Sequence, residues 1–62
     1  MIDKAKLEDA LDAADRARTK VEIAALQLSA AGLKDSEEVA RLRAASEALR
    51  QARKLLLDRR TA

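Results

Sequence analysis

Few side chains in this sequence could take part in chemistry, and none has a partner suited to it. The chain of 62 residues contains no His, Cys or Tyr, so the commonest general base and the thiol nucleophile are both missing. Ser29, Ser36 and Ser46 therefore have no His to act as the base that activates a nucleophilic hydroxyl. We expect no enzymatic activity.

Carboxylates offer the only other route to a ligand site. Glu8 and Asp12 stand four positions apart, and side chains at that spacing are neighbours on a helix, where two carboxylates could approach a cation. The chain lacks the inward-facing Glu-x-x-His sets of di-metal helical bundles. We expect no metal, no other cofactor and no small-molecule ligand.

A basic face is the one feature that could recognise a polyanion. Arg43, Arg50 and Lys54 fall on one side of a helix that covers the second half of the chain, and Lys and Arg are the residues that contact phosphates. Glu47 interrupts this row, and the chain has no aromatic side chain that could stack on bases. A solvated basic face is the preferred interpretation, and nucleic-acid binding is the alternative.

The residues that must position these side chains are strong helix formers. Ala, Leu, Glu, Arg and Lys dominate the sequence, Pro is absent, and 39% of the residues are charged with a net charge of +2. No apolar run approaches the roughly 18 residues of a membrane span, and the charged start lacks the apolar region of a signal peptide. We expect a soluble all-α chain without a targeting signal, which would stay in the cytoplasm if expressed in bacteria.

The single glycine divides the chain into two helices. Gly32 follows an apolar periodic segment, where glycine ends helices in the left-handed conformation and lets Leu33 pack against Leu28. Asp35 then caps the next helix, with Glu38 completing a capping box.

The first helix is predicted to begin after Asp3. Asp3 is the N-cap, and Ile2 and Leu7 form a hydrophobic staple. For the second helix, Ser36 is an alternative N-cap to Asp35. We predict an antiparallel two-helix hairpin. The predicted ranges are 4–31 for the first helix, 32–35 for the turn and 36–59 for the second helix, in one domain of residues 1–62.

Apolar residues recur every seven positions in both helices. In the first helix a Leu/Val-rich row and an alanine row are offset by three, as are the a and d positions of a heptad. Alanine lets two helix axes approach to about 8 Å, so the alanine rows are predicted to form the hairpin seam. The predicted seam residues are Ala10, Ala17, Ala24, Ala31, Ala45 and Ala52.

Such a seam buries too little area to offset the entropy of ordering the chain. We therefore expect the hairpin to self-associate into a four-helix or larger bundle, first as a homodimer, with a cyclic trimer or higher ring as the alternative. In an antiparallel dimer Ile23 and Leu26 of one chain would approach Leu55 and Leu57 of the other. The predicted oligomer interface comprises Leu7, Leu11, Val21, Ile23, Leu26, Leu28, Leu42, Leu49, Leu55, Leu56 and Leu57.

Charges are placed as an antiparallel hairpin requires. Acids lie early in the first helix and bases lie late in the second, so the two groups become adjacent and set the register. Arg18 and Ser46 lie beside the predicted seam at matching positions. Boundary positions are the preferred interpretation, and a polar contact between helices that specifies the oligomer is the alternative.

The whole chain resembles de novo designed helical hairpins that form homo-oligomers. Its staple, glycine stop, capping box, heptads and end charges all favour one fold, which is the consistency that design imposes. By length and hairpin shape it is also similar to the Rop family of RNA-binding antiparallel dimers. The RNA face of that family uses aromatic residues and this chain has none, so the resemblance implies a fold and no functional residues.

Overall fold

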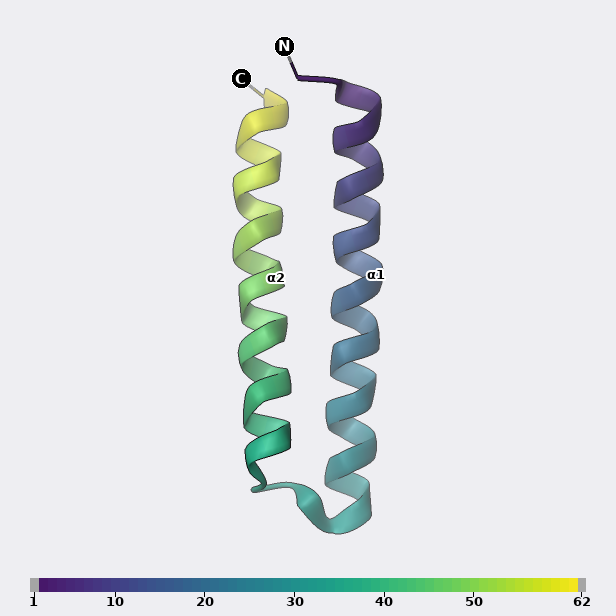
Figure 1. Ribbon diagram of the computed structural model, residues 1–62, viewed down its shortest axis with the longest axis vertical. Helices are drawn as coiled ribbons and strands as arrows, with labels where there is room; N and C mark the ends of the chain where they lie inside the picture. The colour runs from purple at the N-terminus through teal and green to yellow at the C-terminus, as the bar shows by residue number, and fades with distance from the viewer. Residues whose placement is uncertain (1, 62) are drawn as a thin grey trace.

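Two helices of equal length lie side by side and run in opposite directions (Figure 1). The computed structural model describes residues 2–61, and residues 1 and 62, the ends of the predicted domain, lie outside the described part. No strand occurs within residues 2–61. The fold is therefore an all-α hairpin, as predicted from the sequence. The elements are α1 at Lys4–Leu28, the π-helical turn η1 at Ser29–Leu33, and α2 at Glu37–Thr61.

The hairpin is a rod rather than a ball. Its principal extents are 47 × 14 × 12 Å and its radius of gyration is 14.3 Å. A compact domain of this length would have a radius of gyration of about 11 Å. Each helix can therefore cover the other on one side only.

The start of α1 is determined by Asp3. Its carboxylate accepts hydrogen bonds from the backbone amides of Ala5 at 3.0 Å and Lys6 at 3.2 Å. Its carbonyl oxygen accepts the amide of Leu7 at 3.0 Å. Two of the amides that a helix N-terminus leaves unsatisfied thus find a side-chain partner.

The turn depends on Gly32. Its φ of 96° lies in the left-handed region, and no other residue of the described chain has a positive φ. A Cβ atom at this position would meet nothing within 4 Å, so glycine is favoured here by conformation and not by space. A helix that ends at a left-handed glycine often closes with a hydrogen bond from the next residue to the residue five positions earlier, the spacing of a π-turn. The regular part of α1 accordingly ends at Leu28 and not at the predicted residue 31.

Ser36, and not Asp35, caps α2. Its hydroxyl accepts the amide of Val39 at 3.3 Å, and its carbonyl accepts the amide of Ala40 at 3.2 Å. The predicted capping box of Asp35 and Glu38 is therefore wrong, and the alternative cap is correct. The physical reason lies in the turn, because the Ser36 amide closes it on the Leu33 carbonyl at 3.0 Å and leaves the Ser36 carbonyl as the first acceptor of α2.

The core of the hairpin is small and comes from the leucine rows. Leu7, Leu11 and Ala25 of α1 are 8%, 6% and 8% exposed, and Val39 of α2 is 1% exposed. Half-buried residues extend this contact along both helices, and they share the spacing of the buried ones. They include Ala14, Val21 and Leu28 of α1 and Leu42, Leu49 and Leu56 of α2.

The predicted alanine seam is consequently wrong. Ala10, Ala31, Ala45 and Ala52 are exposed, and Ala17 and Ala24 are half-buried. The hydrophobic effect gives the reason, since burial stabilises in proportion to apolar area and a leucine or valine carries far more of it than an alanine. The rows of Leu7 and Leu11 on α1 and of Val39 and Leu42 on α2 therefore turn inward, and the alanines are left beside them.

Candidate interaction surfaces

The seam has two flanks, and one of them is polar. The Leu7 row of α1 consists of residues 7, 14, 21 and 28. The residues that follow each of these by one position lie about 100° further round α1, and they include Glu8, Asp15 and Glu22. Arginines of α2 reach these acids: the Arg53 Nε atom lies 2.8 Å from Asp15 Oδ1, and the Arg60 Nη1 atom lies 2.8 Å from Glu8 Oε1. Early acids thus meet late bases, as the antiparallel arrangement predicts.

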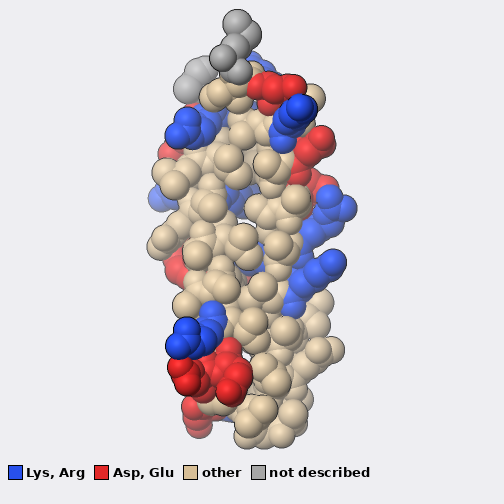
Figure 2. All heavy atoms as spheres, in the orientation of Figure 1, with Lys and Arg blue, Asp and Glu red and all other residues tan. Residues whose placement is uncertain are grey.

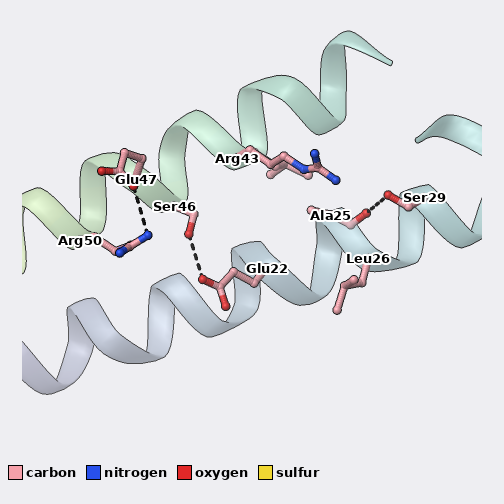
Figure 3. A pocket seen from close by; sticks show the side chains of 9 residues that line it. Glu22, Ala25, Leu26, Ser29, Arg43, Ser46, Glu47 and Arg50 are labelled. Carbon is pink, nitrogen blue, oxygen red and sulfur yellow. Dashed lines mark hydrogen bonds and ion pairs between the residues drawn. The ribbon is translucent and has the colours of Figure 1, made fainter. Parts of the chain in front are cut away.

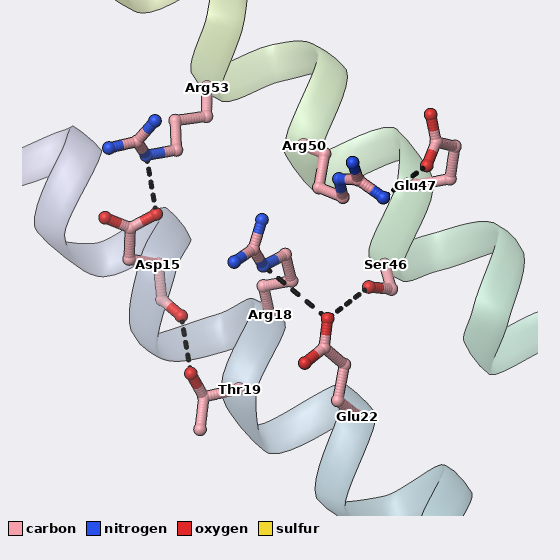
Figure 4. Close-up of polar contacts among 8 residues, drawn as sticks. All are labelled: Asp15, Arg18, Thr19, Glu22, Ser46, Glu47, Arg50 and Arg53. Atoms are coloured by element: carbon pink, nitrogen blue, oxygen red, sulfur yellow. Dashed lines mark hydrogen bonds and ion pairs between the residues drawn. The ribbon is translucent and has the colours of Figure 1, made fainter.

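Arg18 and Ser46 meet on this flank through a shared partner (Figure 4). Ser46 of α2 donates a hydrogen bond to Glu22 Oε1 at 3.0 Å, and the Arg18 Nε atom lies 3.6 Å from the same oxygen. Both side chains belong to seam rows, yet their polar ends reach the solvated flank, as long amphipathic side chains do. The contact joins the two helices of one hairpin.

Arg50 of the predicted basic face, and Arg53 and Arg60 beside that face, have acidic neighbours. Arg50 lies 3.3 Å from Glu47 on α2 itself, and Arg53 and Arg60 pair with α1. Within residues 2–61, Arg43 and Lys54 make no ion pair. The face therefore presents fewer free cations than its sequence indicates.

A shallow groove of about 350 Å³ opens on the polar flank near the turn (Figure 3). Polar and apolar side chains both line it, and the contact between Glu22 and Ser46 crosses it. Ser29 donates its hydroxyl to the Ala25 carbonyl at 2.9 Å, so that hydroxyl already has an acceptor. The groove is lined by Glu22, Ala25, Leu26, Ser29, Leu42, Arg43, Ser46, Glu47 and Arg50.

The charged residues do not gather into an ion site. In the described part of the chain, no group of three or more acidic side chains is placed to hold a metal ion. Glu8 and Asp12, the predicted carboxylate pair, each bind an arginine instead: Glu8 binds Arg60 and Asp12 binds Arg16, at 2.8 and 2.9 Å.

The other flank of the seam is apolar. The Leu42 row of α2 consists of Leu42, Leu49 and Leu56. On each helix, the residues three positions after the Leu7 row or the Leu42 row lie about 60° from that row, on the side away from Glu22 and Ser46. Here the half-buried leucines leave part of their surface open, with alanines next to them. We define this apolar face as Ala10, Ala17, Ala24 and Leu28 of α1 with Ala45, Leu49, Ala52 and Leu56 of α2.

Figure 2 shows an uncharged surface that covers both helices along most of the rod. Charged side chains lie mainly at its edges and ends. A face of this kind, rimmed by polar residues and with no partner inside the hairpin, is typical of a protein interaction site. The alanine rows predicted for the hairpin seam thus lie on the outside, together.

The residues predicted for an oligomer interface divide into two groups. One group lies in the hairpin seam and is buried or half-buried there: Leu7, Leu11, Val21, Leu28, Leu42, Leu49 and Leu56, with Leu57 half-buried beside them. The second group is exposed, with Ile23 at 48%, Leu26 at 71% and Leu55 at 65%. Leu26 lines the polar groove, whereas Ile23 follows Val21 by two positions and points about 200° away from the seam. Ile23 and Leu26 are three positions apart and so are neighbours on the outer side of α1, whereas Leu55 lies on α2.

None of the helices in residues 2–61 combines the length and the apolar character that crossing a membrane requires. No family model, curated protein or solved structure matches this chain. The two flanks of the hairpin are therefore the basis on which its function is inferred.

Proposed function

We propose that the chain is a structural helical module that self-associates into a bundle and has no catalytic activity. The observation that carries the proposal is the size of the core. Within residues 2–61 only Leu7, Leu11, Ala25 and Val39 are buried, and a single small core supplies little stability below about 70–80 residues. The chain has no Cys for a disulfide, so association with further helices is the remaining support.

The large exposed area of the hairpin also supports self-association. The hairpin exposes 4949 Å², whereas a folded monomeric protein of its mass exposes about 4,000 Å². The excess of roughly 1,000 Å² compares with the about 800 Å² that each partner buries in a standard protein interface. One interface per chain would bring the exposed area to the ordinary range, which makes a homodimer the simplest assembly, with a cyclic ring of three or more as the alternative.

The ion pairs of α2 favour self-association over nucleic-acid binding. Arg50, Arg53 and Arg60 already have carboxylate partners, and a cation that must first leave such a partner gains less from a phosphate. Affinity for nucleic acid depends on released counterions and so falls steeply with salt. We expect no binding of this kind, and a measurement of affinity at low and high salt checks it.

The test of self-association is the solution mass across a concentration series. Sedimentation equilibrium with interference optics suits a chain without Trp or Tyr, and circular dichroism on the same samples reports helicity. We expect one oligomeric mass, twice the 6.8 kDa of the chain for a homodimer, and a loss of helicity on dilution because folding is coupled to assembly. A fully helical monomer at every concentration would contradict the proposal.

A further inference from the structure

The row Glu38–Ala45–Ala52–Arg59 forms the edge of the apolar face along α2. Its members are seven positions apart, so they follow one side of the helix, and all four are exposed. An acid stands at the turn end, a base stands at the open end, and two alanines lie between them. A row that carries opposite charges at its two ends is complementary to itself when reversed.

We infer that two copies of this chain pack through the apolar face, with α2 of one copy antiparallel to α2 of the other. The inference rests on the proposed function and adds the surface, the orientation and the register. The two-fold axis would pass between positions 48 and 49, because this register sets Glu38 opposite Arg59 of the second copy and Ala45 opposite Ala52. Two-fold symmetry repeats each of these contacts, as an isologous interface requires.

The side chains of the face suit close packing of two helices. Small residues at the contact let helix axes approach to about 8 Å, and here alanine occupies the contact positions of both helices. The half-buried Leu49 and Leu56 lie directly beside the row. Their open surface would be covered by the second copy, which is the burial that the leucines lack in a single hairpin.

The polar flank does not fit a second copy in this way. Asp15, Glu22, Arg18 and Arg53 lie there in contacts within the hairpin, and an interface over them would remove these charges from water. Desolvating ion pairs costs free energy that their attraction often does not recover. The apolar face carries no charge between its two ends, so it avoids this cost.

Disulfide trapping tests the register, because the chain has no Cys of its own. Two single variants, Ala45→Cys and Ala52→Cys, are mixed and oxidised, and the products are weighed under non-reducing conditions. We expect the mixed disulfide to be the main product. In a dimer of Ala45→Cys alone, the inferred register separates the two introduced thiols by seven positions along the helices, roughly 10 Å. This separation exceeds the about 7 Å limit between the Cα atoms of a disulfide.

The matched control is the pair Ala44→Cys and Gln51→Cys. These residues are also exposed and seven positions apart, but they lie about 100° further from the seam, on the outside of α2. We expect little cross-linking from this pair. Equal yields from both pairs, or cross-linking of Ala45→Cys with itself, would overturn the inferred register. Circular dichroism confirms that each variant is folded before oxidation.

Charge reversal supplies a second test of the same register. Glu38→Arg and Arg59→Glu each set like charges opposite one another in both symmetric contacts, and each should weaken the dimer roughly tenfold. An equimolar mixture of the two variants should recover the wild-type affinity as a heterodimer. If the mixture stays as weak as its components, the register is wrong even though the chain self-associates. A monomeric wild-type chain would overturn this inference and the proposed function together.

Discussion

Ser46 of α2 donates a hydrogen bond over 3.0 Å to Glu22 of α1, and this contact joins the two helices in the half of the hairpin nearer the turn. The Glu22 carboxylate is also 3.6 Å from the Arg18 guanidinium. It therefore contacts two polar groups that come from seam rows, the Ser46 hydroxyl on α2 and the Arg18 guanidinium on α1. A polar group in a seam costs free energy unless it finds a partner. Here Arg18 and Ser46 find the same partner at the solvated edge.

The variant Ser46→Ala should leave stability nearly unchanged, within about 0.5 kcal/mol. It removes one exposed hydrogen bond, typically worth about 1 kcal/mol, and it replaces Ser by the best helix former, which recovers up to about 0.5 kcal/mol. Urea unfolding monitored by circular dichroism at fixed protein concentration measures the difference. A loss above about 2 kcal/mol, beyond the usual net worth of one hydrogen bond, would mean that the Glu22 contact stabilises the hairpin far more than its exposure indicates.

Asp15 and Arg53 should be coupled weakly and in a salt-dependent way. The two charged atoms are 2.8 Å apart, and the side chains are 46% and 42% exposed, so water screens their attraction. A double-mutant cycle of Asp15→Ala and Arg53→Ala should give a coupling free energy of about 0.2–1 kcal/mol. Repeating the cycle at about 1 M salt, where the screening length falls to about 3 Å, should reduce it. A coupling that does not change with salt would contradict this account.

Ser36→Ala should cost about 1 kcal/mol of stability, within the range of about 0.5–2 kcal/mol for lost N-caps. The Ser36 hydroxyl is the acceptor for the Val39 amide, and alanine leaves that amide without a side-chain partner. Asp35→Ala is the matched control, one position earlier, and it should cost much less. The two thermal midpoints, measured at one concentration, decide which residue is the cap. The reverse order of costs would restore the capping box of Asp35 and Glu38.

Gly32→Ala should destabilise the hairpin by about 1–2 kcal/mol, the cost of a left-handed conformation for a residue with a Cβ. The backbone φ of 96° at this position imposes that conformation. Because no atom lies within 4 Å of a Cβ built there, Gly32→Asn should cost less than alanine, since asparagine tolerates this conformation better. Thermal unfolding of both variants at one concentration gives the two costs. Equal losses would instead indicate a steric conflict.

Leu11→Ala and Leu26→Ala should have opposite outcomes. Leu11 is 6% exposed in the seam, and truncating a buried leucine costs about 2 kcal/mol or more. Leu26 is 71% exposed, so its truncation should change stability by less than about 0.5 kcal/mol. Chemical unfolding of both variants at one concentration gives the comparison. A large loss for Leu26→Ala would place this residue in an interface between subunits.

Local signals predict the elements of the fold well. The Asp3 cap and the Gly32 stop are local signals, because each acts on the backbone within one turn of itself. No helix breaker occurs elsewhere in the sequence. The sequence places the second cap one residue too early because both Asp35 and Ser36 are good caps. Only the path of the turn, in which the Ser36 amide bonds to the Leu33 carbonyl, separates the two.

The sequence by itself determined that the chain forms two helices, where they turn, and that early acids meet late bases. It did not determine which side of each helix turns inward. Rows offset by three and by four from Leu7 lie about 60° to one side of it and about 40° to the other, so the heptad period fits either one. The alanine row is the predicted choice because alanine lets two helix axes approach closely. The tertiary structure reverses that choice, since Leu11 and Ala25 are buried against α2 while the Arg18 guanidinium reaches Glu22 at the open edge.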